Sequence, residues 1–132
     1  MSIKVALATK LKSITALTAK VDTRIYSVKL PQDFNLPAVT FRVTDDRPQR
    51  TLEGHSGKTR TDFEIIYNDK SDTAAETGGD IIWKAIDGFS GTVSDIKIQS
   101  ISLITRLDEY DYDINVYQRV MVFKIGHIEA TT

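Results

Sequence analysis

Residues 51–60 read TLEGHSGKTR and combine a carboxylate, an imidazole, hydroxyls and two cations in one short stretch. His55 lies between Glu53 and Ser56, and such side chains can serve as orienting acid, base and nucleophile. Neighbouring residues of a loop, however, rarely hold the fixed distances that a nucleophile and its base require. The sequence also lacks the G-x-S-x-G turn that presents a nucleophilic serine. We therefore interpret His55 as a solvated loop histidine and expect no enzymatic activity.

The letters GHSGKT in this stretch resemble part of a phosphate-binding loop. That motif requires four residues between its glycines, then Gly-Lys-Ser/Thr and a helix. Gly54 and Gly57 are too close together, and a strand pattern follows them. The sequence therefore does not predict a nucleotide site, and we expect no cofactor.

A second candidate is the acidic run DEYDYD. Hard cations bind several carboxylates at once, and an extended chain would direct residues 109, 111 and 113 to one side. The run lacks the glycine and the closing glutamate of a calcium loop. A charged hairpin rim is the favoured interpretation, a metal site the alternative, and we expect no bound metal. The acidic residues are Asp108, Glu109, Asp111 and Asp113.

Composition limits the class of protein. The 132 residues suffice for a single domain, expected over residues 1–132, and 41% apolar with 27% charged residues is typical of a globular chain. The net charge of −1 provides no overall attraction to nucleic acid or to an anionic membrane. Basic residues that could form a patch are better explained as rim contacts to a partner protein. These residues are Arg42, Arg47, Arg50, Lys58, Arg60 and Arg119.

The chain contains no cysteine, which excludes disulfides and thiolate chemistry and suits a reducing cytoplasm. Lysines interrupt the N-terminal apolar residues, and no apolar run reaches about 18 residues. We expect neither a secretory signal nor a membrane partner.

An amphipathic helix is predicted over residues 2–19, because apolar side chains recur at steps of three and four. Residues 20–37 contain Pro31 and Pro37 and lack periodicity, which predicts a packed irregular connection. A second helix is predicted over residues 72–88. The apolar positions of the first helix are Ile3, Leu7, Leu11, Ile14 and Leu17.

The second helix has Ser71 or Asp72 as its N-cap and Gly88 at its end. Gly78 and Gly79 each cost a helix about 1 kcal/mol relative to alanine. We therefore expect the helix backbone to pack closely there, against a sheet or a neighbouring subunit.

Alternation of apolar and polar residues predicts a hairpin of two strands, over residues 37–44 and 59–67. Residues 46–58 between them contain Pro48, Gly54 and Gly57, and we expect a long, mobile hairpin tip there. The apolar rows are Val39, Phe41 and Val43 in the first strand, and Phe63, Ile65 and Tyr67 in the second.

A third strand is predicted from Ile96, with a bulge near Ser100, and a fourth over residues 114–125. The fourth strand is apolar on both faces, so its second face must meet another layer of this chain or another copy. The predicted fold is α+β, in the order α-β-β-α-β-β. We expect a four-stranded, mainly antiparallel sheet with two helices packed on one face.

Three runs carry a resemblance to a known family: LPAVTFRVTDD, the stretch from Arg50 to Phe89, and YQRVMVFKI. Together they resemble the tail terminator proteins of long-tailed bacteriophages, also called tail completion or tail-to-head joining proteins. Gly78-Gly79 departs from the alanine or leucine expected there. The matching positions are Pro31, Pro37, Gly54, Gly57, Tyr67, Ser71, Ala74, Ala75, Gly88 and Arg119.

The resemblance implies a structural virion protein of the tail or neck, assembled in the host bacterial cytoplasm. Such proteins form a ring, usually hexameric, that caps the tail tube, stops its elongation and joins the tail to the head connector. The implied partners are further copies of the chain, the tail tube protein and the head-tail connector protein. DNA would pass through the ring without sequence-specific binding.

Within that function, the hairpin tip is interpreted as an assembly arm that contacts a partner protein. Its candidate contact residues are Arg47, Arg50, Glu53, His55, Lys58 and Arg60. The acidic residues 108–113 would face the lumen, where negative charge keeps DNA from adhering. The alternatives are another neck or head-completion adaptor protein, and a small metal-dependent hydrolase that uses the acidic cluster.

Overall fold

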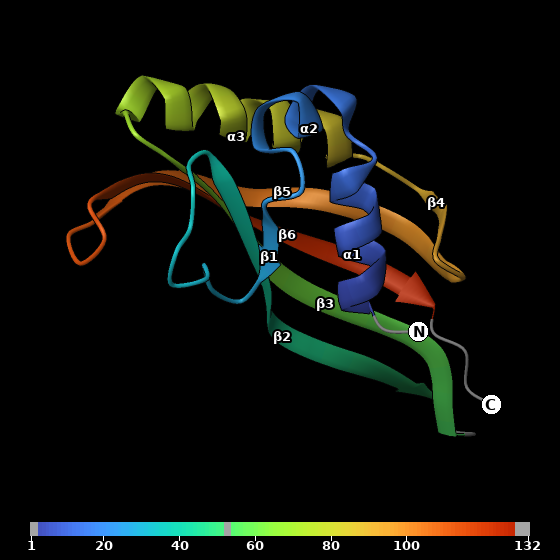
Figure 1. The fold of residues 1–132 in the computed structure, drawn as a ribbon. Helices are drawn as coiled ribbons and strands as arrows, with labels where there is room; N and C mark the ends of the chain where they lie inside the picture. The colour runs from blue at the N-terminus through green and yellow to red at the C-terminus, as the bar shows by residue number, and fades with distance from the viewer. Residues whose placement is uncertain (1–2, 52–53, 129–132) are drawn as a thin grey trace.

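A computed structural model describes the backbone of residues 3–51 and 54–128, and the side chains of residues 3–45 and 59–128. Within this part of the chain, three helices lie on one face of a six-stranded sheet (Figure 1). The helices are α1 (Ile3–Lys12), α2 (Thr15–Val21) and α3 (Asp72–Ile86). The strands are β1 (Ile25–Ser27), β2 (Ala38–Thr51), β3 (Gly54–Asp69), β4 (Gly91–Val93), β5 (Ile96–Asp111) and β6 (Val116–Ile128).

The sheet has the strand order β1-β2-β3-β6-β5-β4. Strand β1 runs parallel to β2, and the other neighbours are antiparallel. The prediction of a four-stranded sheet with two helices is therefore wrong: the sheet is mixed, has six strands and curves into a half-barrel under three helices. The strands that were missed, β1 and β4, are three residues long, too short to show an alternating pattern.

The predicted first helix is interrupted. Helix α1 ends at Lys12, and Ile14 becomes the extended residue before α2. The hydroxyl of Ser13 donates to the carbonyl of Lys10 at 2.6 Å. Serine side chains compete in this way with helical backbone hydrogen bonds. Because the apolar spacing continues across the break, periodicity alone could not reveal it.

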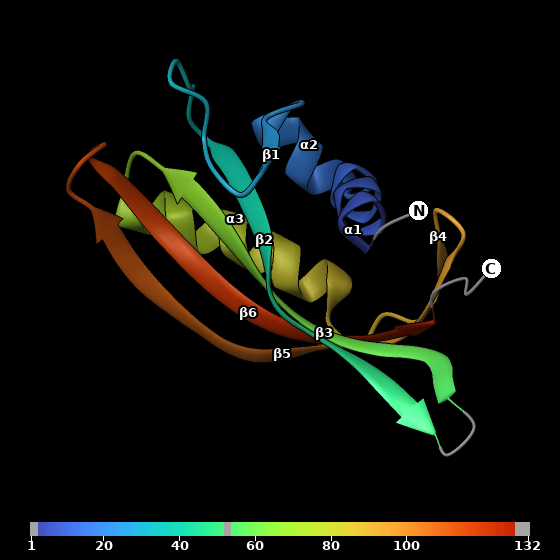
Figure 2. The ribbon, with the colours of Figure 1, turned by 90° about the horizontal axis from the view of Figure 1, so that it is seen from below.

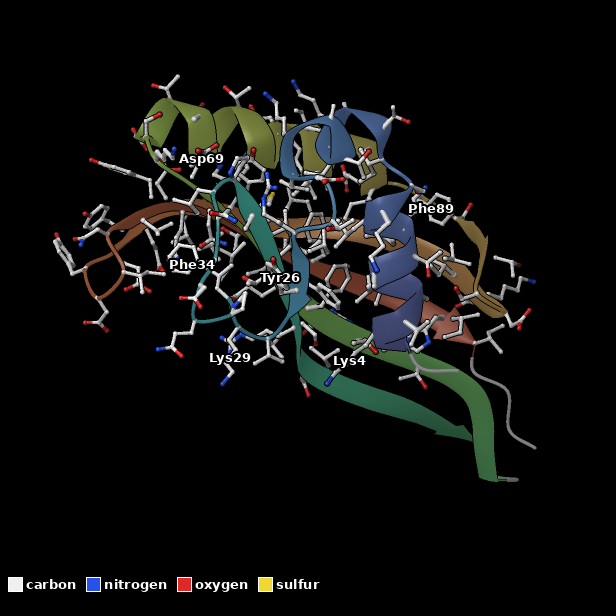
Figure 3. All side chains as sticks on the ribbon, viewed as in Figure 1. Lys4, Tyr26, Lys29, Phe34, Asp69 and Phe89 are labelled. Carbon is white, nitrogen blue, oxygen red and sulfur yellow. The ribbon has the colours of Figure 1, made fainter. Side chains whose placement is uncertain are left out.

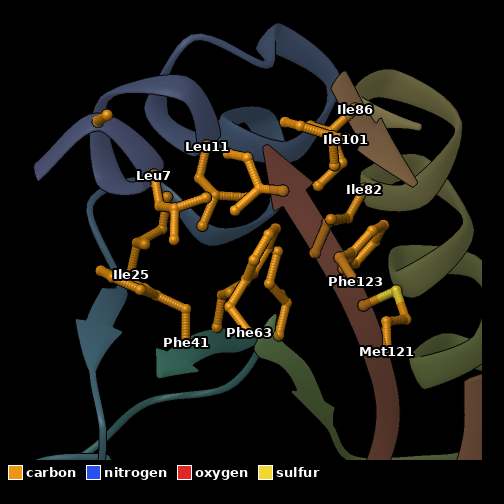
Figure 4. Close-up of a cluster of buried hydrophobic side chains, with 14 of the residues drawn as sticks. Leu7, Leu11, Ile25, Phe41, Phe63, Ile82, Ile86, Ile101, Met121 and Phe123 are labelled. Atoms are coloured by element: carbon orange, nitrogen blue, oxygen red, sulfur yellow. The ribbon is translucent and has the colours of Figure 1, made fainter. Parts of the chain in front are cut away.

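The core lies between the helices and the sheet (Figure 4). Leu7 and Leu11 of α1 and Ile82 and Ile86 of α3 point onto the central strands. Phe63 of β3 and Phe123 of β6 stack there, with ring centroids 5.2 Å apart. The apolar rows predicted for these strands therefore form the core, as expected.

Helix α3 confirms the predicted cap and close packing. The Ser71 hydroxyl accepts a hydrogen bond from the Ala74 N–H at 3.2 Å. Gly78 and Gly79 lie directly over Tyr67 of β3 and Arg119 of β6. Gly88 follows the helix with a φ of +80°, a conformation that glycine adopts readily. The close approach is therefore made to the sheet of the same chain.

The stretch predicted as a long loop is largely a β-ribbon. Strands β2 and β3 remain paired beyond the body, with Arg47 opposite Arg60 and Thr51 opposite Gly54. The stretch is the end of the hairpin, as predicted, but the prediction of a loop is wrong for residues 46–51 and 54–58, which are strand. Residues 52–53 lie outside the described part. The ribbon escaped prediction because its residues are polar on both faces, so no apolar row marks it.

Candidate functional site: the arm and the uncovered face of the sheet

The end of the β2–β3 hairpin, residues 46–51 and 54–58, is called the arm here. It extends away from the helix-covered body in both views (Figures 1 and 2). Lys58 is opposite Ile128, the last residue of β6, so residues 54–57 of β3 have β2 as their only strand neighbour in the described sheet. A two-stranded ribbon is at best marginally stable in water. The arm therefore gains stability from any surface that it contacts.

The predicted contact residues lie on the arm or at its base. Arg47, Arg50, His55 and Lys58 occupy strand positions, and Arg60 is an exposed residue of β3. Glu53 lies outside the described residues. The register brings Arg47 opposite Arg60 and Arg50 opposite His55. On β6, Gly126 is opposite Arg60 and His127 is opposite Thr59. No carboxylate of β6 is therefore paired with these two residues at the base of the arm.

Within the described residues, the second face of the sheet carries no helix, as the view from below shows (Figure 2). It is called the uncovered face here. One row of cross-strand neighbours on this face is apolar apart from a threonine, and consists of Thr40, Ile66, Val120 and Leu107. The next row toward the arm consists of Arg42, Glu64, Val122 and Thr105. This face therefore has an apolar strip between charged groups.

The uncovered face is hollowed into a groove of about 490 Å³. Ile66, Val120 and Leu107 are among its lining residues, and Val28, at the end of β1, also lines it. Val28 is 57% exposed and Leu107 39% exposed. The segment with Lys29 and Phe34, seen in Figure 3, borders a second hollow of about 450 Å³ that shares Val28 and Ile66 with the first.

The second apolar face of β6 is thus only partly covered by its own chain. Val116 and Val120 are buried within one copy, whereas Val122 is half-buried beside the groove. The apolar second face of β6 was predicted from the sequence, whereas its continuation through Ile66 and Leu107 was not. A signal was present for Ile66, because it interrupts the polar row of Arg60, Asp62 and Glu64.

The acidic residues 108–113 divide between the two faces of the β5–β6 hairpin. The guanidinium of Arg119 lies 2.7 Å from the Asp108 carboxylate, and this ion pair is on the face of the sheet that carries α3. Glu109 and Asp111 line the groove, and Asp113 lies in the turn, where its N–H donates to Asp111 Oδ1 at 2.9 Å. In the described part of the chain, neither Glu109 nor Asp111 forms an ion pair.

The division of these carboxylates does not suit a metal ion. Across the described residues, no three His, Cys, Asp or Glu side chains are grouped as a metal site would require. In the same residues, none of the helices has the length and apolar character to cross a bilayer.

Two aromatic residues, Tyr67 of β3 and Trp83 of α3, pack at the interface of the helix and the sheet. Tyr67 is buried under α3, and this burial raises its pKa, with the Asp69 carboxylate and its hydrogen bond as further causes. Trp83 is half-buried, donates from Nε1 to Asp80 at 2.8 Å, and lies 4.6 Å from the Arg106 guanidinium. Both aromatics therefore support the packing of α3.

The geometry is that of a structural domain: a helix-covered sheet, a protruding β-ribbon and an open groove with unpaired carboxylates. The family model for tail completion protein gp17 matches residues 5–127. The chain belongs to the tail completion protein gp17 family, which confirms the resemblance drawn from the sequence. It is therefore a structural protein of the bacteriophage tail, and its place is in the virion tail or neck.

Solved structures support the same fold. A chain from the virion of a native gene transfer agent particle superposes with a TM-score of 0.77 at 15% identity, over 95% of this chain and 92% of that one. A second chain, whose title states no function, has a TM-score of 0.61 at 9% identity, over 100% of this chain and 99% of that one. No curated protein matches the sequence.

Proposed function

We propose that the protein closes the end of the phage tail tube as a ring of its own copies, hexameric in the arrangement that the resemblance implies. The ring stops elongation of the tube and presents a surface to the head-tail connector. Its partners are therefore further copies of the chain, the tube protein and the connector protein. Family membership supports the location of this role in the tail.

The observation that carries this proposal is the arm, which extends beyond the body as a two-stranded ribbon. Protruding ribbons and loops on a rigid sheet commonly serve recognition. The uncovered face is a further surface that a neighbour would bury. DNA passes through the lumen in this proposal, and the carboxylates of the β5–β6 hairpin would limit its adhesion.

Deletion of residues 50–58 tests the proposal. The deleted chain should fold, because the buried core positions of β2 and β3 begin outside the arm. Phage carrying the deletion should produce tails that do not join heads or that vary in length, as seen by electron microscopy. Phage particles of normal infectivity and tail length would contradict the proposal. Light scattering on the purified chain should detect a ring or a concentration-dependent oligomer.

A further inference from the structure

The uncovered face is polarised along its strands. At the end near the arm, the side chains of Arg60, Lys97 and Lys124 are exposed. At the opposite end, Glu109 and Asp111 line the groove. Between the two ends, Arg42 and Glu64 neutralise each other at 3.2 Å. Asp62, half-buried, is the cross-strand neighbour of Lys124 at the first end. One copy therefore presents a net basic end and an acidic end on the same face.

Among the described residues, the acidic end has no cationic partner. In the described residues, Glu109 and Asp111 have no ion pair, and they stand beside the exposed apolar surface of Leu107 and Val28. A ligand for this groove must supply cationic groups and apolar stems together. Arginine meets both needs, because its methylene stem packs on apolar surface while its guanidinium binds carboxylates.

The arm and its base carry such residues. Their basic residues are Arg47, Arg50, Lys58 and Arg60, against Asp46 and Glu53. Arg47 and Arg60 are direct cross-strand partners. A two-stranded ribbon is weak on its own. A carboxylate surface on a neighbouring molecule would match the net positive charge that the sequence gives this ribbon.

We propose that the arm of one copy docks in the groove of the next copy, with Arg47 and Arg60 close to Glu109 and Asp111. This inference rests on the proposed ring, for which it names the contact between copies. The arm and the β5–β6 hairpin, which carries the acidic end of the groove, lie at opposite ends of the sheet (Figures 1 and 2). The arm of one chain therefore cannot reach the groove of the same chain. The contact is therefore heterologous, and each copy donates one arm and receives another.

The docked arm also covers Leu107 and Ile66, the residues of the apolar strip that keep exposed surface in a single copy. A contact that buries apolar surface around charged pairs combines affinity with orientation. In this arrangement Glu109 and Asp111 belong to the interface between copies. Asp113, in the β5–β6 turn, is left to face the lumen.

Charge exchange tests the contact. The arm variant Arg47→Glu/Arg60→Glu and the groove variant Glu109→Lys/Asp111→Lys should each weaken self-association by about tenfold or more. A chain carrying all four substitutions should recover most of the loss, because the charges are exchanged rather than removed. Glu76→Lys, at an exposed position of α3, is the matched control and should associate like the wild type. Sedimentation over a concentration series measures each constant, and circular dichroism verifies folding.

Cross-linking tests the same contact inside assembled tails. Because the chain has no cysteine, introduced thiols are the only ones present. Chains with Arg60→Cys and chains with Glu109→Cys, carrying different tags, are supplied together to phage that lack the gene. Mild oxidation of purified tails should give more of the mixed disulfide, between Cys at position 60 and Cys at position 109, than of either disulfide between two identical variants. An equal yield of all three pairs, or no mixed pair, would overturn the inference.

The failure of this contact is distinguishable from failure of the proposed function. If charge-reversed chains still assemble and produce infectious particles, copies meet through another surface, and the proposed ring stands without this contact. If the arm deletion leaves tail length and head joining unchanged, the proposed function itself fails. Restored association in the four-fold variant, together with the mixed disulfide, supports both.

Discussion

The ring of Tyr67 fills the space that a side chain at Gly78 would occupy. A Cβ at Gly78 would overlap the Tyr67 ring, and this ring is only 1% exposed and cannot move aside. The glycine that lowers the intrinsic stability of α3 therefore permits the helix to lie close to β3. Tertiary packing outweighs helix propensity at this position.

Gly78→Ala is expected to destabilise the protein. Alanine improves helix propensity by about 1 kcal/mol, whereas overpacking of a buried site costs about 1–3 kcal/mol and a severe overlap more. The net change in the free energy of unfolding should be a loss of about 1–2 kcal/mol, measured by urea denaturation. Glu76→Ala, exposed on the same helix, should change it by less than about 0.5 kcal/mol. A stabilised Gly78→Ala variant would contradict this account of the packing.

Tyr67 should make stability fall in alkaline solution. Burial first, and then the Asp69 carboxylate and its hydrogen bond, raise the pKa of Tyr67 in the folded state. The unfolded tyrosine loses its proton at about pH 10 while the folded one keeps it. The unfolded state is then favoured as pH rises above about 10, and the contribution is absent at neutral pH.

Tyr67→Phe should flatten this alkaline decline, although it loses some stability at pH 7 with the hydrogen bond. Urea denaturation between pH 8 and pH 11 gives the two profiles. The control is Tyr112→Phe, because the Tyr112 side chain is 82% exposed. Identical alkaline slopes for Tyr67→Phe and the wild type would show that Tyr67 is not the source.

Ser71→Ala should remove the N-cap of α3. The lost hydrogen bond leaves the Ala74 N–H without its side-chain acceptor, at a cost of about 1 kcal/mol. Ser71→Asp should retain most of the stability, because aspartate also caps helices and its charge favours a helix N-terminus. The midpoints of thermal or urea unfolding provide the comparison. Equal midpoints for the alanine and aspartate variants would refute the role of the cap.

Asp108→Ala should leave the guanidinium of Arg119 without its carboxylate. The Arg119 side chain is 12% exposed, and its stem lies directly against Gly79. Removing one partner of a largely buried pair costs more than removing a surface pair. Because Asp108 itself is half exposed, a loss of about 1–2 kcal/mol is expected. Asp113→Ala is the control, since Asp113 is an exposed turn residue. A similar small change in both variants would show that the pair contributes little.

Much of the body of the fold was predictable because its signals are local. The apolar row through Phe63 identified a core strand, and Ser71 and Gly88 marked the ends of α3 nearly to the residue. The bulge near Ser100 was also correct, since a register shift lies between Ile98 and Ser100. Side-chain alternation and caps depend on a few neighbouring residues, which a sequence displays directly.

The candidate site was predictable only in part. Arg47 and Arg60 were correctly assigned to the hairpin, but their direct cross-strand pairing depends on the bulge in β2 between Val43 and Asp45. The residues of the acidic run were expected to act as one group. The pleat and the turn instead direct Asp108 toward Arg119, and Glu109 toward the groove.

The sequence by itself determined the core rows, the ends of α3, the need for close packing at Gly78 and the family to which the chain belongs. Tertiary structure alone decided that Ile25–Ser27 pairs with β2, that the polar stretch beyond Asp45 continues as a ribbon, and that Ile66 and Leu107 share one groove. The physical reason is that short strands and polar ribbons are held by backbone hydrogen bonds to distant segments. Such bonds are available to almost every residue type and leave little trace in the side-chain pattern.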